Sequence, residues 1–100
     1  MNMQSIMQQA QKMQRDLQKA KDELAKMEFV GTNGGAVTVT LFGNRLVKGF
    51  QIDPTLLNPE DGEMLSEMLK NATNTALKQV DEAEAAMNQR ITGRSGGMGF

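Results

Sequence analysis

The chain of 100 residues contains no cysteine, no histidine, no tryptophan and no tyrosine. Without cysteine it has no disulfide framework and no thiolate, and without histidine it lacks the usual transition-metal ligand and the side chain best suited to proton transfer near neutral pH. Its serines and threonines therefore have no histidine to activate them. We expect no enzymatic activity, no metal, no cofactor and no small-molecule substrate.

Long apolar runs are also missing from the sequence. No stretch reaches the length of a membrane span, and the N-terminus has no apolar core of signal-peptide length. We therefore expect a cytoplasmic protein that does not enter a membrane. One hundred residues predict a single domain, and a chain of this size often completes a modest core by oligomerising.

The charge is nearly balanced, with a net value of −1 at pH 7. The chain as a whole therefore lacks the basic character of a typical nucleic-acid binder. The distribution is uneven, however, because residues 1–28 and 29–58 each carry +1 and residues 59–100 carry −3. An anion is expected to bind the first half, and the absence of tryptophan and tyrosine disfavours base stacking of the single-strand-binding kind.

A heptad repeat of apolar residues runs from Met3 to Met27. Apolar residues recur at alternating spacings of three and four: Met3, Ala10, Leu17 and Leu24 at a, and Ile6, Met13, Ala20 and Met27 at d. The repeat predicts a helix of about 37 Å at 1.5 Å per residue. Since a domain of this size is narrower, part of the helix should project or meet a second copy. The pattern leaves open whether the seam packs within one subunit or across two.

Cations follow this helix on the face away from the seam. Lys12, Lys19 and Lys26 occupy c positions, Arg15 an f position, and Lys21 lies on a flank. Regularly spaced cations suit a row of phosphates, so all five residues are candidate contacts to a polyanion. A charged stripe opposite a seam is also typical of a merely solvated coiled-coil flank.

A change of period predicts three antiparallel strands between residues 27 and 52. Val37, Val39 and Leu41 alternate with threonines, which is typical of a strand with one apolar face. We predict a two-residue turn at Gly43-Asn44, which places Lys48 opposite Val39 as a misfit on that face. Leu46, Phe50 and Ile52 should complete the apolar face.

The preceding turn has two possible positions, at Asn33-Gly34 or at Gly34-Gly35. Both place Val30 on the apolar face. The glycines are interpreted as turn residues rather than a phosphate-binding loop, because no Gly-Lys-Ser/Thr follows them. The second face should carry Phe29, Thr38, Thr40, Phe42 and Val47. It is either a subunit contact or an ordinary wet sheet face.

A second helix is expected after Pro54, with Asn58 as its cap and Pro59 at its first position. Its apolar stripe, which should cover the sheet, consists of Leu65, Leu69, Ala72, Ala76, Val80, Ala83, Met87 and Ile91. Asp81, Glu82 and Glu84 are interpreted as a solvated face rather than a metal site. Gly93 is predicted to end the helix, giving one domain over residues 1–92 and a flexible Gly/Met-rich tail over residues 93–100.

The order of these elements, with several short motifs, resembles the YbaB/EbfC family of bacterial nucleoid-associated proteins. The matching pieces, which span nearly the whole chain, are Gln9-Ala10-Gln11-Lys12-Met13-Gln14, Gly31-Thr32-Asn33-Gly34-Gly35 before Val37-Thr38-Val39, Gly43, Ile52-Asp53-Pro54-Thr55-Leu56-Leu57, and the Gly/Met/Phe tail. The resemblance implies a homodimer whose helices project like arms from a joined β core. It also implies binding of double-stranded DNA with little sequence preference, and a role in nucleoid organisation or gene regulation.

The expected fold is therefore α+β, in the order α-β-β-β-α, as an intertwined homodimer. The expected function is non-specific binding of double-stranded DNA by that dimer in the nucleoid, through phosphate contacts from Lys12, Arg15, Lys19, Lys21 and Lys26. The dimer interface is expected to involve Ile6, Met13, Leu17, Phe29, Phe42 and Val47. The alternative is a scaffold or adaptor whose Met-rich heptad helix binds a partner protein, since methionines suit adaptable recognition.

Overall fold

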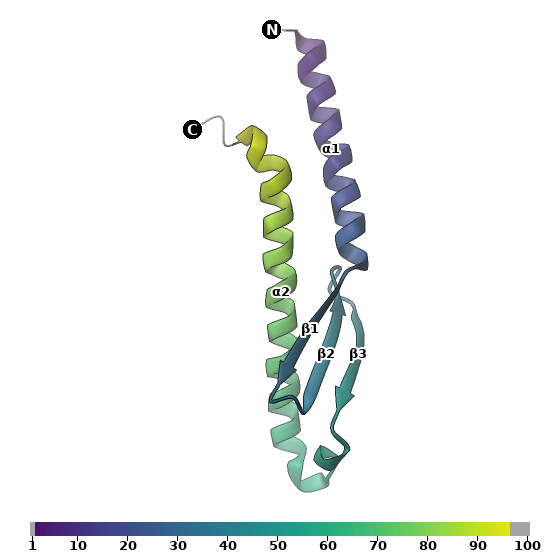
Figure 1. Ribbon diagram of the computed structural model, residues 1–100, viewed down its shortest axis with the longest axis vertical. Coiled ribbons are helices and arrows are strands. Elements are labelled where there is room, and N and C mark those ends of the chain that lie inside the picture. Colours follow the sequence, from purple (N-terminus) through teal and green to yellow (C-terminus); the bar gives the residue numbers. More distant parts are fainter. Residues whose placement is uncertain (1, 97–100) are drawn as a thin grey trace.

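A computed structural model describes residues 2–96 of the chain, with side chains through residue 93. The molecule is elongated, 69 × 25 × 16 Å, with a helix at each end of the chain and a three-stranded sheet between them (Figure 1). Its elements are α1 (Met3–Lys26), β1 (Glu28–Asn33), β2 (Val37–Phe42), β3 (Val47–Ile52), two short 3-10 turns (Pro54–Leu56 and Pro59–Asp61) and α2 (Gly62–Gly96). The predicted α-β-β-β-α order is confirmed.

The first helix forms where the heptad repeat predicts it. Its residues are mostly Gln, Lys, Met, Leu and Ala, which are strong helix formers. Asn2 caps its N-terminus, since the side-chain oxygen accepts a hydrogen bond from the Gln4 amide at 3.0 Å. Met27 adopts an extended conformation and ends the helix. The chain then passes directly into β1, so α1 continues beyond one end of the sheet (Figure 1).

The hairpin between β1 and β2 has a longer loop than either predicted turn. Asn33 pairs with Val37 across a three-residue loop, in which Gly34 and Gly35 adopt positive φ. Val30 consequently pairs with Thr40 and lies on the outer face of the sheet, so its predicted place on the apolar face is wrong. A shift of one residue moves every side chain of a strand to the opposite face.

The same shift moves Phe29 to the inner face, where it pairs with Leu41. Its predicted place on the outer face with Phe42 is therefore also wrong. Phe29 is half-buried against Ala20, Leu24 and Met87 of the same chain.

The hairpin between β2 and β3 also differs from the predicted two-residue turn. The Phe42 amide donates to the Leu46 carbonyl at 2.8 Å, and Arg45 adopts a φ of 71° within the three-residue loop. A bulge then leaves Lys48 without a partner residue, because Leu41 pairs with Val47 and Thr40 pairs with Gly49.

The predicted pairing of Val39 with Lys48 is therefore wrong, and Val39 pairs with Phe50 instead. The extra loop residue and the bulge together shift the register by two. Leu46 is exposed, contrary to its predicted place in the apolar face. The Lys48 ammonium is not a misfit over the core, because it lies 2.8 Å from a carboxylate oxygen of Glu28.

The main core lies between α2 and the first two strands. Val37, Val39 and Leu41 are buried against Ala72 and Ala76 of α2. The predicted stripe of α2 is confirmed, since Ala72, Ala76, Val80 and Met87 are buried and its other members are half-buried. α2 makes most of its contacts with β1 and β2 and little with β3, which lies on the far side of the sheet (Figure 1).

A second, smaller core joins the two helices beyond the sheet. Ala20 and Leu24 of the heptad seam are buried against Met87, with Ala83 and Ile91 packed beside them. Ala20 and Leu24 of the seam are therefore covered by α2 of the same chain, whereas Met27 at the end of the seam is 54% exposed. The N-terminal half of the seam is not covered, because Met3 and Ile6 are 75% and 47% exposed.

The two ends of α2 differ from the prediction. Asn58 precedes a 3-10 turn rather than the α-helix, and its side chain makes no capping bond to a backbone amide but donates to the Thr55 carbonyl at 2.9 Å. The helix also continues through Gly93 to Gly96, so Gly93 does not end it. Of the predicted tail, residues 97–100 lie outside the described residues.

Candidate nucleic-acid interface

Four of the five predicted contact cations form one flank of α1. At 100° per residue, Lys12, Arg15, Lys19 and Lys26 fall within an arc of about 60° around the helix axis. We call these four residues the cationic flank. All four are exposed. The fifth, Lys21, is also exposed but lies on the other side of α1, so the structure does not bring it together with the flank.

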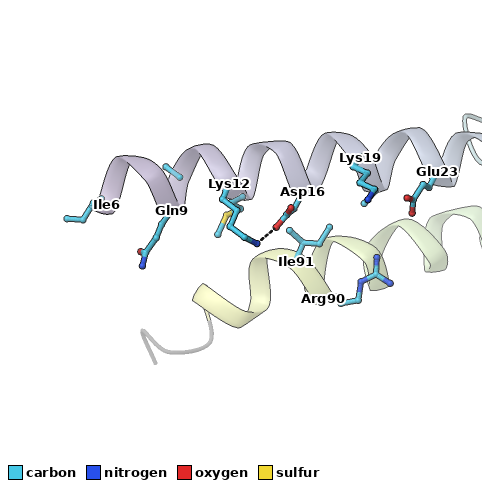
Figure 2. Close-up of a pocket in the computed structure, with 11 residues that line it drawn as sticks. Ile6, Gln9, Lys12, Asp16, Lys19, Glu23, Arg90 and Ile91 are labelled. Atoms are coloured by element: carbon cyan, nitrogen blue, oxygen red, sulfur yellow. Dashed lines mark hydrogen bonds and ion pairs between the residues drawn. The ribbon is translucent and has the colours of Figure 1, made fainter. Parts of the chain in front are cut away.

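The cationic flank borders an open groove between α1 and the end of α2 (Figure 2). The groove has a volume of about 770 Å³, an apolar floor and charged rims. Lys12 and Lys19 lie on its α1 rim, so these two lysines face the groove rather than the side of the helix directly away from the seam. The lining residues are Ile6, Gln9, Ala10, Lys12, Met13, Asp16, Lys19, Ala20, Glu23, Arg90 and Ile91.

Arg90 is the cation of this region that the sequence alone did not indicate. It precedes Ile91, the last residue of the apolar stripe of α2, and lies on the side of α2 that faces α1 (Figure 2). Its place opposite Lys19 follows from the antiparallel packing of the two stripes. That packing was not determined by the heptad, which left open what the seam contacts.

Ion pairs distinguish these cations from others in the chain. Lys12 lies 3.0 Å from Asp16, one turn further along α1. Among the residues that the structure describes, no ion pair within 4.0 Å involves the other cations of this region. Those cations are Arg15, Lys19, Lys21, Lys26 and Arg90. Within the cationic flank, Arg15, Lys19 and Lys26 are therefore the most available to an external anion.

The cations near the sheet are engaged within the chain. Arg45, in the β2–β3 loop, donates to Asp81 at 2.6 Å and to Glu84 at 3.3 Å. The hydrogen bond to Asp81 contributes most, and the one to Glu84 next, to raising the pKa of the Arg45 guanidinium above its ordinary value. The acids of α2 predicted to be a solvated face thus hold this loop against the helix. Positive charge available for binding is concentrated on α1 and the facing end of α2.

The described part of the chain also bears on metal binding and on membrane insertion. No group of three or more carboxylate side chains there is placed to hold a metal ion. No described helix is both long and apolar enough to cross a membrane.

Five of the six predicted interface residues fall into two separate regions. Ile6, Met13 and Leu17 lie on the seam of α1, where Met13 and Leu17 are half-buried. Phe42 and Val47 lie at the β2–β3 hairpin but on opposite faces. Val47, which is 48% exposed, pairs with Leu41 and so lies on the inner face, and its predicted place on the outer face is wrong. Phe29 belongs to neither region, because it packs against residues of its own chain.

Comparison with known proteins shows which family has this fold and this sequence. A solved structure of an uncharacterized protein from Helicobacter pylori has the same fold, with a TM-score of 0.79 over 91% of this chain and 97% of that chain, at 23% identity. The sequence profile of the YbaB/EbfC DNA-binding family matches residues 1–95. The chain therefore belongs to the YbaB/EbfC DNA-binding family, as its resemblance predicted.

Several relatives are named nucleoid-associated proteins. One from Clostridium novyi is 43% identical over 94 residues, covering 93% of this chain and 82% of that protein. One from Lactococcus lactis is 43% identical over 83 residues, covering 82% of this chain and 84% of that protein. A third, from Streptococcus pneumoniae, is 45% identical over the same length and with the same coverage.

Proposed function

We propose that the protein binds double-stranded DNA of the bacterial nucleoid as a homodimer, through phosphate contacts from α1 and with little sequence preference. It contributes in this way to nucleoid organisation or gene regulation. Membership of a DNA-binding family and the names of the relatives support the partner and the location. The single observation that carries the mode of binding is the cationic flank of α1.

The flank suits a row of phosphates. Lys12 and Lys26 are fourteen residues apart, or about 21 Å along the helix axis. That length matches about six base-pair steps of B-DNA, each about 3.4 Å along the duplex. Contacts to phosphates position a protein on DNA but carry no sequence information directly. Binding through this flank is therefore strong only in low salt and tolerant of sequence.

Salt dependence tests the proposed mode of binding. If Arg15, Lys19 and Lys26 of two subunits each contact a phosphate, log K should fall with log salt with a slope of about −5, since six contacts contribute about 0.9 each. We expect this slope, and similar affinities, for two unrelated duplexes of equal length in a fluorescence-anisotropy titration. Salt-independent binding, or binding to only one duplex, would contradict the proposal.

The side of the sheet near β3 supports a dimer. Phe50 pairs with the fully buried Val39 and so lies on the same face, yet it is 52% exposed because α2 reaches little beyond β2. Val47 is similarly uncovered at the start of the strand. β3 is also an edge strand, with a row of backbone groups available for pairing. We assign the dimer interface to this side, where the same surface of a second copy meets it about a two-fold axis.

Replacing Phe50 by glutamate should separate the subunits. Each copy of Phe50→Glu would bring a carboxylate into the interface, and a buried unpaired charge is strongly disfavoured. We expect light scattering to give about 22 kDa for the wild type, twice the chain mass of 11.0 kDa, and 11.0 kDa for the variant.

Val30→Glu is the matched control, because Val30 is an apolar strand residue that is 49% exposed on the outer face. It should remain dimeric. A dimeric Phe50→Glu protein, or a monomeric Val30→Glu protein, would place the interface elsewhere.

A further inference from the structure

The free end of α1 is uncovered on its apolar side. α1 runs past the end of α2 (Figure 1), and the groove between the two helices stays open there. Met3, Ile6 and Met7 are 75%, 47% and 58% exposed. Met3 and Ile6 belong to the heptad seam, which ordinarily packs along its whole length, and Met7 lies beside it, so these exposures are high.

The uncovered residues continue the same seam that α2 covers further along. We call Met3, Ile6, Ala10 and Met13 the distal seam. Their spacing of three, four and three continues at Leu17, Ala20 and Leu24, of which Ala20 and Leu24 pack against α2. The distal seam is thus a regular helix-binding surface with no helix on it among the described residues. The floor of the adjoining groove is apolar and includes Ile91 of α2.

Charge distinguishes the distal part of α1 from the part that carries the other three residues of the cationic flank. Residues 2–14 contain one charged side chain, Lys12, and that lysine is paired with Asp16. Residues 15–28 contain eight charged side chains: Arg15, Asp16, Lys19, Lys21, Asp22, Glu23, Lys26 and Glu28. The distal seam therefore has few cations beside it to bind DNA, and few charges of either sign to bind a strongly charged protein. An identical neutral helix approaches without repulsion.

We infer that the distal seam binds the distal seam of a second copy, so that arms of different dimers associate in antiparallel pairs. In this alignment Ile6 of one helix lies beside Ala10 of the other, and Met3 lies beside Met13, because both pairs are centred on the level of residue 8. Each contact joins an a position to a d position, as antiparallel seams require. The second helix also enters the groove and covers its apolar floor.

This inference goes beyond DNA binding by one dimer, because it gives each dimer two further attachment points. Arms that associate in this way link separate dimers, each of which retains its own cationic flank. The assembly therefore joins separate stretches of duplex. The partner that the distal seam requires is therefore a second copy of this chain.

The substitution Ile6→Glu tests the inference, with Gln8→Glu as its matched control. Both add one carboxylate to an exposed position of α1, but Gln8 lies about 200° from Ile6 around the helix. In sedimentation velocity, the wild type and the control should rise with concentration from about 22 kDa, twice 11.0 kDa, to about 44 kDa and above. The Ile6→Glu protein should remain at the dimer mass and keep its affinity for a short duplex.

Other outcomes would overturn the inference and separate it from the proposed function. If the wild-type protein never exceeds the dimer mass, the distal seam does not bind a second copy and the inference is wrong. If the mass exceeds that of the dimer only after residues 97–100 are removed, those residues, and not a second copy, occupy the groove in the full chain. An Ile6→Glu protein of 11.0 kDa would make the seam the dimer interface itself, and a wild type of 11.0 kDa would refute the proposed dimer.

Discussion

Reversing the charge of Arg15 and Lys19 together should strongly weaken DNA binding while leaving the protein folded and dimeric. Both side chains are exposed on the cationic flank, and neither makes an ion pair within the described residues. In a dimer, the Arg15→Glu/Lys19→Glu variant loses four phosphate contacts and gains four negative charges. We expect the affinity to fall by roughly two orders of magnitude or more, and the salt slope to shrink by about four, at about one per contact.

The control for this prediction must carry the same change of net charge. Lys70→Glu/Lys78→Glu does so, since both double variants take the chain from −1 to −5, with each reversal contributing −2. Lys70 and Lys78 are exposed on α2, and Lys70 is already paired with Glu67. We expect this control to bind with a small loss of affinity in the same anisotropy titration. Equal losses in the two variants would mean that net charge, rather than the flank, determines binding.

Replacing Gly31 by alanine should cause a large loss of stability from a single added methyl group. Gly31 lies within β1 at the point where the strand crosses α2, beneath the small residues Ala72 and Ala76. A Cβ at this position would overlap the Ala72 carbonyl oxygen and lie 2.7 Å from the Ala76 amide nitrogen. Both obstacles are helix backbone, which cannot rotate away, so α2 must lift from the sheet and loosen the main core.

We expect Gly31→Ala to lower the free energy of unfolding by about 3 kcal/mol, the upper end of the usual cost of overpacking. For a chain of this size, that loss lowers the melting temperature by roughly 12–24 °C. Gly49→Ala is the matched control, because no atom lies within 4 Å of its added Cβ. Thermal unfolding followed by circular dichroism measures both. A Gly31→Ala protein as stable as the control would contradict the close packing of β1 on α2.

The helices and their buried faces could be predicted because periodicity in the sequence reports burial directly. The stripe of α2 was identified from its spacing alone, including Ala72 and Ala76 at the crossing with β1. The role of Gly31 was not, because a glycine beside Asn33-Gly34-Gly35 is typical of a turn. Only the three-dimensional packing shows that the missing side chain of Gly31 allows the backbone of α2 to approach β1 closely.

The strand register could not be predicted because it depends on single residues in the loops. Each hairpin has one more loop residue than predicted, and a bulge at Lys48 adds a further shift. An odd shift in β1 exchanged the faces of Phe29 and Val30, whereas the total shift of two kept Phe50 on its predicted face. The local sequence cannot distinguish a two-residue turn at Gly43-Asn44 from a three-residue loop in which Arg45 adopts positive φ.

The candidate site was predicted in part. The cations of α1 could be placed on one flank because the helix and its heptad fix their angles. The pairing of Lys12 with Asp16 and the approach of Arg90 depend on side-chain geometry and on how α2 packs. The ion pair of Lys12 favours Arg15, Lys19 and Lys26 as phosphate contacts, and the position of Arg90 adds one further candidate cation.

The most direct test of DNA binding through α1 is a map of the residues that respond to a duplex. Amide chemical shifts of ¹⁵N-labelled protein would be followed as a short duplex of arbitrary sequence is added in low salt. The largest changes should fall between Lys12 and Lys26 and at Arg90, and should disappear when salt is raised. Changes confined to the outer face of the sheet or to the first turns of α2, with α1 unaffected, would contradict it.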